Sequence, residues 1–452
     1  MEFSDGLPPA QRRRALITLG IAIGVSVLDS TIANIALPSI AADLHVSPAS
    51  SVWVVNAYQM AVIAGLLPCA SLGDILGYRR VYAVGLVIFT LASLACALSP
   101  TLPVLAASRA VQGLGGAGMM SVNTALVRFI WPRRMLGRGM GYNAMIVATS
   151  AAIGPSIAAG ILSVARWPFL FSVNLPLGGL ALVLIGALPS SPRSGHRFDA
   201  ISAVMNAAAF ILLISGLDGI AHGDGATRVC LEFAGAALVG FGFVKRQLVV
   251  PAPMLPVDLF RRPVFALTVA TSVCSFLAQT IVYVAMPFLF EVAMGHTQVA
   301  TGLMMTPWPV MVGLVAPYAG RLADKFPAGT LGGIGLSIMT CGLVVLLLLP
   351  GNPPAWQAMW RMALCGAGFA LFQSPNNRQM LGSVPRERSG AGSGMLSTAR
   401  LLGQTSGAAM VAVLFGLTEA AGVGQGARAA LVLAIGCGVV GTVCSSLRMV
   451  RY

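Results

Sequence analysis

The sequence has very little charge. Only 9% of its 452 residues are charged, whereas 57% are hydrophobic, and soluble globular proteins carry about 25% charged residues. So few charges cannot cover the surface of a water-soluble chain of this length, which excludes a soluble enzyme and a disordered protein. The eight cysteines are too sparse for a secreted disulfide scaffold and include no Cys-x-x-Cys pair. The remaining class is a polytopic membrane protein, whose first partner is the lipid bilayer.

Clusters of reactive side chains are also missing. The sequence contains no nucleotide-binding loop of the G-x-x-x-x-G-K-[ST] type, which argues against direct drive by ATP. The four histidines fall in predicted loops. No pair of acids, and no nucleophile together with a base, is found at a common depth in the predicted membrane helices. We therefore expect no metal, no cofactor and no enzymatic activity.

What the sequence does have is long apolar runs. They are continuous over about 20 residues, the length that an α-helix needs to cross a bilayer, whereas barrel strands alternate polar and apolar residues. The runs predict an all-α polytopic membrane protein with fourteen transmembrane helices. These helices are expected at 15–37, 52–72, 81–99, 103–127, 140–164, 168–188, 201–218, 229–249, 264–290, 299–320, 330–350, 355–377, 391–416 and 427–446.

The 28 basic residues are distributed unevenly over the predicted loops. With both termini in the cytoplasm, 22 lie on the inside, three on the outside and three within helices. This bias follows the positive-inside rule and supports an even number of spans. It also accounts for the net charge of +14 without nucleic acid as a partner. The first apolar run lacks a clear cleavage site, so we expect a multi-pass protein of the inner or plasma membrane with both termini cytoplasmic.

Two short patterns recur at nearly the same separation. Asp74 follows the second predicted helix and Asp324 the tenth, 250 residues apart. Arg109 and Arg361 each precede a glycine-rich stretch and lie 252 residues apart. The repeat predicts two homologous six-helix bundles, 1–188 and 263–452, with an insertion of two helices and linkers at 189–262. The alternative is coincidence among helices rich in glycine and alanine.

Four motifs carry a resemblance to a known family. They are LDSTIANIALP at 28–38, the loop at 70–80, RAVQGLGG at 109–116, and Gly154-Pro155 followed by Trp167 and NLPLG at 174–178. With these motifs the chain resembles the fourteen-span drug:proton antiporters of the major facilitator superfamily, the EmrB/QacA type. The resemblance implies a major facilitator fold and proton-driven export of amphipathic drugs or other small molecules by alternating access. An exporter dedicated to one metabolite or natural product is the alternative, and a polytopic membrane enzyme is a more distant one.

Two charged residues are candidates for proton coupling. Asp29 is the one acidic residue placed deep in a predicted helix, and burying such a group costs about 2.5–3.5 kcal/mol on the insertion scale. It is interpreted as a proton or cation carrier, and the alternative is a fixed salt bridge to Arg109. The resemblance links Arg109 to proton coupling, and the alternative is a helix-packing arginine bonded to backbone carbonyls. Protons and a small-molecule substrate are thus the expected partners.

The second half contains no deep carboxylate but several hydrogen-bonding side chains. Arg400 lies near the middle of its predicted helix and either contacts an anionic or polar part of the substrate or has a structural role. The residues expected to line the substrate cavity are Asn34, Tyr58, Gln59, Gln279, Gln373, Asn376, Arg400 and Gln404.

The resemblance further implies a conformational switch. Asp74 and Asp324 are expected to pair the two halves in one state, and simple helix capping is the alternative. The residues assigned to this switch are Asp74, Arg79, Arg80, Gly154, Pro155, Asp324 and Lys325. A periplasmic adaptor and an outer-membrane channel are candidate partners, and the chain is otherwise expected to be a monomer.

Overall fold

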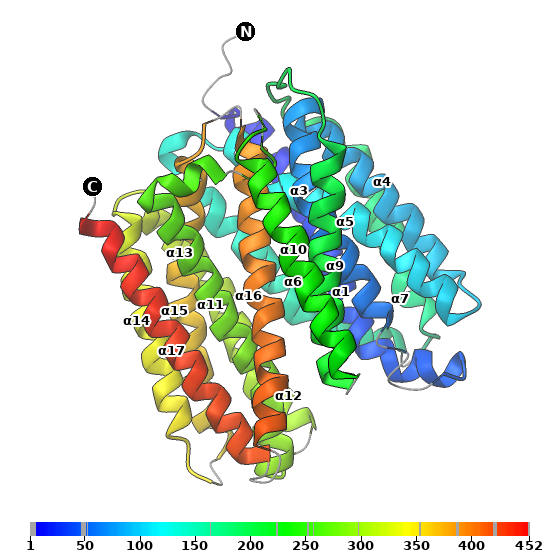
Figure 1. Cartoon of the computed structure of the whole chain (residues 1–452), viewed down its shortest axis with the longest axis vertical. Helices are drawn as coiled ribbons and strands as arrows, with labels where there is room; N and C mark the ends of the chain where they lie inside the picture. The colour runs from blue at the N-terminus through cyan, green and yellow to red at the C-terminus, as the bar shows by residue number, and fades with distance from the viewer. Residues whose placement is uncertain are drawn as a thin grey trace.

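The computed structural model describes residues 6–46, 51, 53–162, 164–222, 225–250, 253–255, 257–296, 298–351, 354–385, 388–418 and 423–450. Within these ranges the chain forms helices and no strand, which confirms the predicted all-α class (Figure 1). The α-helices are α1 (Pro9–Asp43), α3 (Trp53–Leu76), α4 (Tyr78–Ala97), α5 (Leu102–Ile130), α6 (Leu136–Leu162), α7 (Pro168–Ser172), α8 (Asn174–Val183), α9 (Ala200–His222), α10 (Ala226–Gln247), α11 (Pro263–Pro287), α12 (Gln298–Met305), α13 (Pro307–Ala323), α14 (Ala328–Leu347), α15 (Ala355–Gly382), α16 (Ser389–Leu417) and α17 (Val423–Val450).

Nine segments of the described residues are long and apolar enough to cross a membrane. They belong to α1, α3, α4, α7 with α8, α10, α11, α12 with α13, α14 and α17. The other long helices, α5, α6, α15 and α16, contain more glycine and polar residues, and α9 has a shorter apolar stretch. Segments of this kind are typical of a multi-pass membrane protein.

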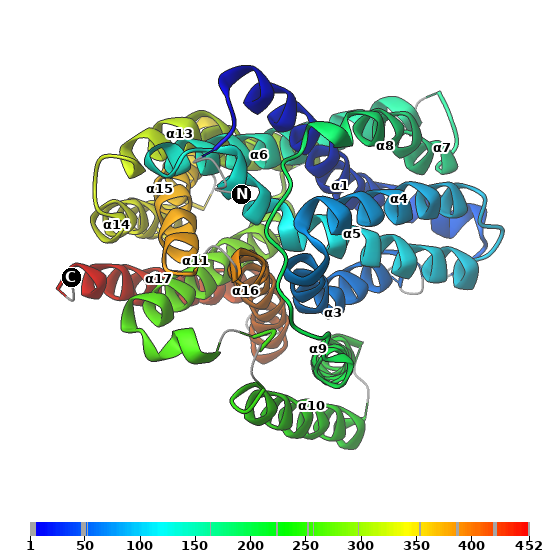
Figure 2. The same cartoon turned by 90° about the horizontal axis from the view of Figure 1, so that it is seen from above.

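The helices form two groups that lie side by side. Helices α1 to α8 make the first half and helices α11 to α17 the second, with α6 and α13 packed against each other between them (Figure 2). Helices α9 and α10 form a pair outside both groups. Asn206 of α9 anchors this pair, because its side-chain amide donates a hydrogen bond to the Ala64 carbonyl of α3 at 3.0 Å.

Glycines bring neighbouring helices into backbone contact in both halves. A Cβ on Gly85 of α4 would lie 2.8 Å from the carbonyl oxygen of Gly115 in α5. In the second half, a Cβ on Gly335 of α14 would lie 2.7 Å from the carbonyl oxygen of Gly368 in α15. Gly85 and Gly335 are 250 residues apart, which is the offset of the sequence repeat. Small residues at such crossings let transmembrane helices gain van der Waals contact where lipid offers no hydrophobic drive.

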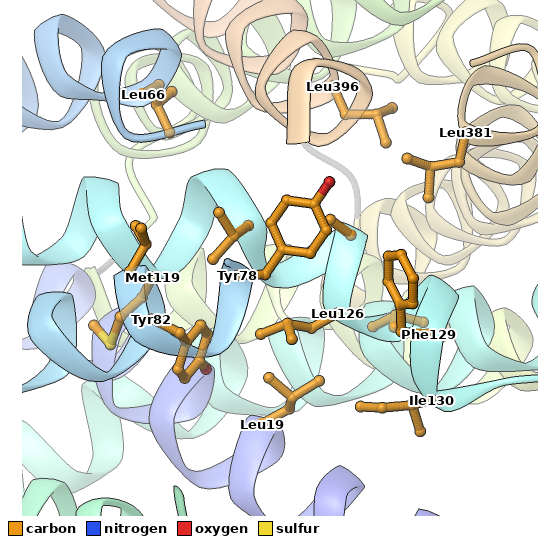
Figure 3. Close-up of a cluster of buried hydrophobic side chains, with 14 of the residues drawn as sticks. Leu19, Leu66, Tyr78, Tyr82, Met119, Leu126, Phe129, Ile130, Leu381 and Leu396 are labelled. Carbon is orange, nitrogen blue, oxygen red and sulfur yellow. The ribbon is translucent and has the colours of Figure 1, made fainter. Parts of the chain in front are cut away.

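The two halves are closed at one end of the bundle. We call it the arginine-rich end; it is the end where α3 and α13 finish and α6 and α16 begin, uppermost in Figure 1. One buried cluster there joins side chains of both halves, and Figure 3 shows Leu381 and Leu396 of the second half beside Tyr78 and Phe129 of the first. Every residue of α16 from 389 to 399 is buried. At the opposite end, the cluster around Trp167 contains described residues of the first half alone.

The α4–α5 contact gives a test of the packing. In Gly115→Val the new side chain meets the Phe89 backbone nitrogen, which a Cβ would approach to 2.5 Å. Because the obstacle is backbone, we expect a loss of at least about 1–3 kcal/mol of stability. Gly179→Ala in α8 is the control, since nothing lies within 4 Å of its Cβ. Thermal unfolding of the purified chain in detergent measures both; equal midpoints for the two variants would contradict the tight contact.

Candidate functional site

A buried ion pair lies inside the first half. Asp29 of α1 and Arg109 of α5 are 2% and 1% exposed, and the Arg109 Nη1 atom donates to Asp29 Oδ2 at 2.5 Å. The Nε atom of Arg109 donates to the carbonyl oxygen of Val54 in α3 at 3.0 Å. The structure therefore brings together the two residues that the sequence assigned to proton coupling, and it does so as a formed salt bridge.

Amide and hydroxyl side chains complete the environment of the carboxylate. Asp29 Oδ1 accepts hydrogen bonds from Gln112 Nε2 at 2.9 Å and from Asn174 Nδ2 at 2.6 Å. Gln112 also donates to Ser93 Oγ of α4 at 2.8 Å and accepts from Arg109 Nη1 at 2.6 Å. All contacts to Asp29 come from donors, which matches an ionised carboxylate because that group only accepts.

Aromatic rings close the site around the guanidinium. The Tyr58 ring centroid lies 4.3 Å from Arg109 Cζ, and the Phe171 ring centroid lies 5.5 Å from it. The Tyr58 hydroxyl is 3.3 Å from Ser26 Oγ of α1. A charge pair walled off by rings interacts strongly, but each charge becomes expensive if the other is neutralised: breaking a buried pair costs about 3–5 kcal/mol. Neutralising either partner would therefore leave the other charge buried and uncompensated.

Five side chains of this site were not predicted from the sequence, namely Ser26, Ser93, Gln112, Phe171 and Asn174. Gln112 stands in RAVQGLGG and Asn174 in NLPLG, two of the motifs that carry the family resemblance. Their polarity inside apolar helices was the available signal. Ser93 carries no such signal, because a lone serine in a helix is common in a membrane protein.

A second group of contacts joins the halves at the arginine-rich end. Asp74, in the last turn of α3, accepts a hydrogen bond from the backbone nitrogen of Gly390 in the first turn of α16 at 3.0 Å. The Tyr78 hydroxyl donates to Asp74 at 2.6 Å and accepts from the same Gly390 nitrogen at 3.0 Å. The carboxylate thus satisfies a free N–H group at the start of a helix of the opposite half.

Asp324 makes the matching contact from the second half. It follows α13 and accepts hydrogen bonds from the backbone nitrogens of Gly137 at 2.8 Å and Arg138 at 3.3 Å, at the start of α6. Arg378 Nε lies 3.7 Å from it. Burial raises the pKa of the Asp324 carboxyl above its ordinary value, and these donors act against that effect. The sequence left two hypotheses for these carboxylates, pairing of the two halves and helix capping. In this geometry they describe the same contact, since each carboxylate caps a helix of the other half.

Small residues allow this close approach. A Cβ on Gly394 of α16 would lie 2.7 Å from the Ala70 Cβ, and a Cβ on Gly141 of α6 would lie 2.4 Å from the Ala316 carbonyl oxygen. Larger residues at these positions would hold the two halves apart.

The other residues assigned to the switch lie away from this contact. Arg79, Arg80 and Lys325 are exposed, and Arg79 Nη1 reaches the Leu188 carbonyl of its own half at 3.5 Å. Gly154 packs against Thr31 of α1, where a Cβ would overlap the threonine hydroxyl. The side chain of Pro155 lies outside the described residues.

The residues expected to line the substrate cavity differ in their burial. Tyr58 belongs to the ion-pair site. Asn376 is fully buried against Ser272 Oγ at 2.7 Å and Arg448 Nη1 at 2.8 Å, so it offers no surface to a ligand in this state. The side chain of Asn34 lies outside the described residues. The remaining ones are exposed or half-buried: Gln59, Gln279, Gln373, Arg400 and Gln404. Within the described ranges no group of three His, Cys, Asp or Glu side chains could hold a metal ion.

Two sequence relatives and one solved structure are similar over most of the chain. It is 53% identical to the protein named Uncharacterized transporter YebQ of Escherichia coli (strain K12), over 96% of this chain and 95% of the relative. It is 31% identical to Multidrug resistance protein Stp of Mycobacterium tuberculosis (strain CDC 1551 / Oshkosh), over 88% and 74%. The human organic anion transporter MFSD10 superposes with a TM-score of 0.70 at 15% identity, over 97% of this chain and 100% of that one, and this likeness concerns the fold alone.

The family follows from these findings together. The model described as Major Facilitator Superfamily matches residues 19–408, and the two helix groups have the same fold as a solved transporter. The chain therefore belongs to the major facilitator superfamily and is a transporter rather than an enzyme.

Proposed function

We propose that the protein is a proton-driven exporter of amphipathic small molecules that works by alternating access. The observation that carries the proposal is the Asp29–Arg109 pair, because a titratable carboxylate buried beside a cation can couple proton uptake to a change of shape. The name of the relative Stp, a multidrug resistance protein, supports the substrate class.

The proposal includes a topology of fourteen spans in the inner or plasma membrane. Five further helices are proposed to cross the bilayer, namely α5, α6, α9, α15 and α16. Helices α5 and α15 pack along the spans α4 and α14, and their glycine and polar residues face protein instead of lipid. Both termini and the arginine-rich end are placed in the cytoplasm by the positive-inside rule. The halves are then 1–188 and 263–452, with the inserted helices at 189–262.

In this scheme the structure is closed toward the cytoplasm. A proton arriving from outside neutralises Asp29, which leaves Arg109 without its counter-charge. Because an uncompensated buried charge costs about 3–5 kcal/mol, the site must rearrange. Opening of the arginine-rich end requires Asp74 and Asp324 to leave α16 and α6. The protonated state is thus proposed to weaken the closed arrangement, and release of the proton inside to restore it.

The proton gradient supplies enough energy for useful export. One charge crossing 100 mV releases about 2.3 kcal/mol, and about 1.4 kcal/mol is a factor of ten in concentration. One proton per substrate therefore sustains a gradient of a few tens-fold.

Replacement of Asp29 tests the coupling. Asp29→Asn keeps the size of the side chain but removes the titratable group, so we expect gradient-driven export to be lost while the protein remains folded. The assay is uptake of a lipophilic dye into everted vesicles after an imposed pH step. Asp43→Asn is the matched control on the same helix, because Asp43 pairs with Arg166 near the surface at 2.6 Å. Export by Asp29→Asn at the wild-type rate would refute the proposal.

Removal of the caps tests the switch. Asp74→Ala and Asp324→Ala each delete a cap worth about 0.5–2 kcal/mol, so the open fraction at the arginine-rich end should rise several-fold. The measurement is the labelling rate of Ser393→Cys by a membrane-impermeant maleimide in a chain without native cysteines, because Ser393 is fully buried in α16.

Asp199→Ala is the control for the switch. Among the described residues, Asp199 makes no side-chain contact between the halves. It accepts a hydrogen bond from Ser202 N at 3.1 Å at the start of α9 and forms an ion pair with Arg246. Burial alone would raise its pKa, but the hydrogen bonds from Arg246 and Ser202 prevail and lower the pKa to about 2. It is therefore an ionised cap at neutral pH. Equal labelling rates in all three variants would show that the caps do not hold the halves together.

A further inference from the structure

Arg400 marks the point on α16 where the closed end stops. It lies eleven residues after the start of the helix at Ser389, about 17 Å along the axis. Residues 389–399 are all buried, whereas Arg400 itself is half-buried and exposed positions follow at 408, 410 and 413. Arg400 therefore lies where the continuously buried segment of α16 ends.

Among the described residues, Arg400 forms no hydrogen bond or ion pair. Its Nε atom is buried and has no partner. The other arginines within predicted helices are held: Arg109 by Asp29, and Arg361 by Gln357, to whose carbonyl its Nη1 donates at 2.9 Å. Arg448, near the end of α17, donates to Asn376. A charge held in a low-dielectric interior is costly without a compensating group.

Among the described residues, no carboxylate offsets the charge of Arg400. The one described titratable side chain that interacts with it is Tyr58 of α3, whose ring also covers Arg109. The charges of Asp29 and Arg109 cancel within their pair. The guanidinium of Arg400 therefore leaves one net positive charge at the interface between the halves.

We propose that Arg400 binds an anionic group, a carboxylate in the first instance, of an amphipathic substrate. The inference rests on the proposed export function and names the class of molecule exported. A guanidinium presents parallel N–H donors that match the two oxygens of a carboxylate, and such charge-assisted pairs are strong when partly shielded from water. Tyr58 connects the two sites, because the bound anion lies beside the ring that packs on Arg109.

This assignment has an electrical consequence. Export of a monovalent anion in exchange for one proton moves two positive charges inward per cycle. A membrane potential that is negative inside therefore drives both movements in the same sense. Neutral substrates would gain only half of this electrical drive.

Binding of two dyes to the full chain in nanodiscs tests the proposal. Fluorescein is anionic and rhodamine 6G is cationic, and both contain the xanthene ring. We expect fluorescein to bind more tightly to the wild-type chain in fluorescence polarisation. Arg400→Gln should weaken fluorescein binding about 10- to 100-fold, as expected for one lost charge-assisted contact, and should leave rhodamine 6G unchanged. Arg361→Gln is the matched control and should change neither.

A second comparison uses the unaltered chain. Fluorescein methyl ester lacks the carboxylate, so it should bind more weakly than fluorescein to the wild type and equally to Arg400→Gln. Equal binding of the acid and the ester to the wild type would overturn the proposal. This comparison does not require that Arg400→Gln folds. The proposed export function has a separate test. If the chain binds the anion but no transport is driven by a pH gradient, the export function is refuted while the anion site is supported.

Discussion

The first half of the protein is organised around one charge pair held out of water. Asp29 of α1 and Arg109 of α5 form hydrogen bonds with groups of α3, α5 and α8, and Gln112 extends the network to Ser93 of α4. Buried charges need such partners because water is excluded from them. The polar groups that surround the pair exist for this reason, and the aromatic rings keep water away. Groups from five helices thus meet in one hydrogen-bonded network around the Asp29 carboxylate.

The second half contains a different kind of buried polar network. A buried cation there, Arg448, donates hydrogen bonds to Asn376, Thr268 and Ser445. These three partners are amide and hydroxyl side chains, which do not titrate near neutral pH. The two halves correspond in the α4–α5 and α14–α15 glycine contacts and in the two carboxylate caps, whereas the ion pair that is buried on both sides, among the described residues, lies in the first half. In the proposed mechanism of alternating access, the halves separate at these caps and rock against each other.

The sequence predicted the helical class, the family and the residues of the ion pair, because long apolar runs and an isolated deep acid have few interpretations. It did not predict that Gly390 and Gly137 would meet Asp74 and Asp324, since a backbone nitrogen leaves no trace in side-chain patterns. Asn376 shows another limit: polarity inside a helix identifies a residue that needs partners but not whether these are ligand or protein. In this structure Asn376 is buried against α11 and α17, so its partners are protein groups.

The inserted helices make the two seams between the halves unequal. Helix α9 packs on α3 of the first half and on α16 of the second, so it covers one seam, while α6 and α13 meet at the other without such a cover (Figure 2). An additional pair of helices thus separates the α3–α16 side of the interface from the surrounding lipid, whereas no described helix covers the α6–α13 side. The insertion thereby gives a nearly two-fold molecule a front and a back with respect to the surrounding lipid.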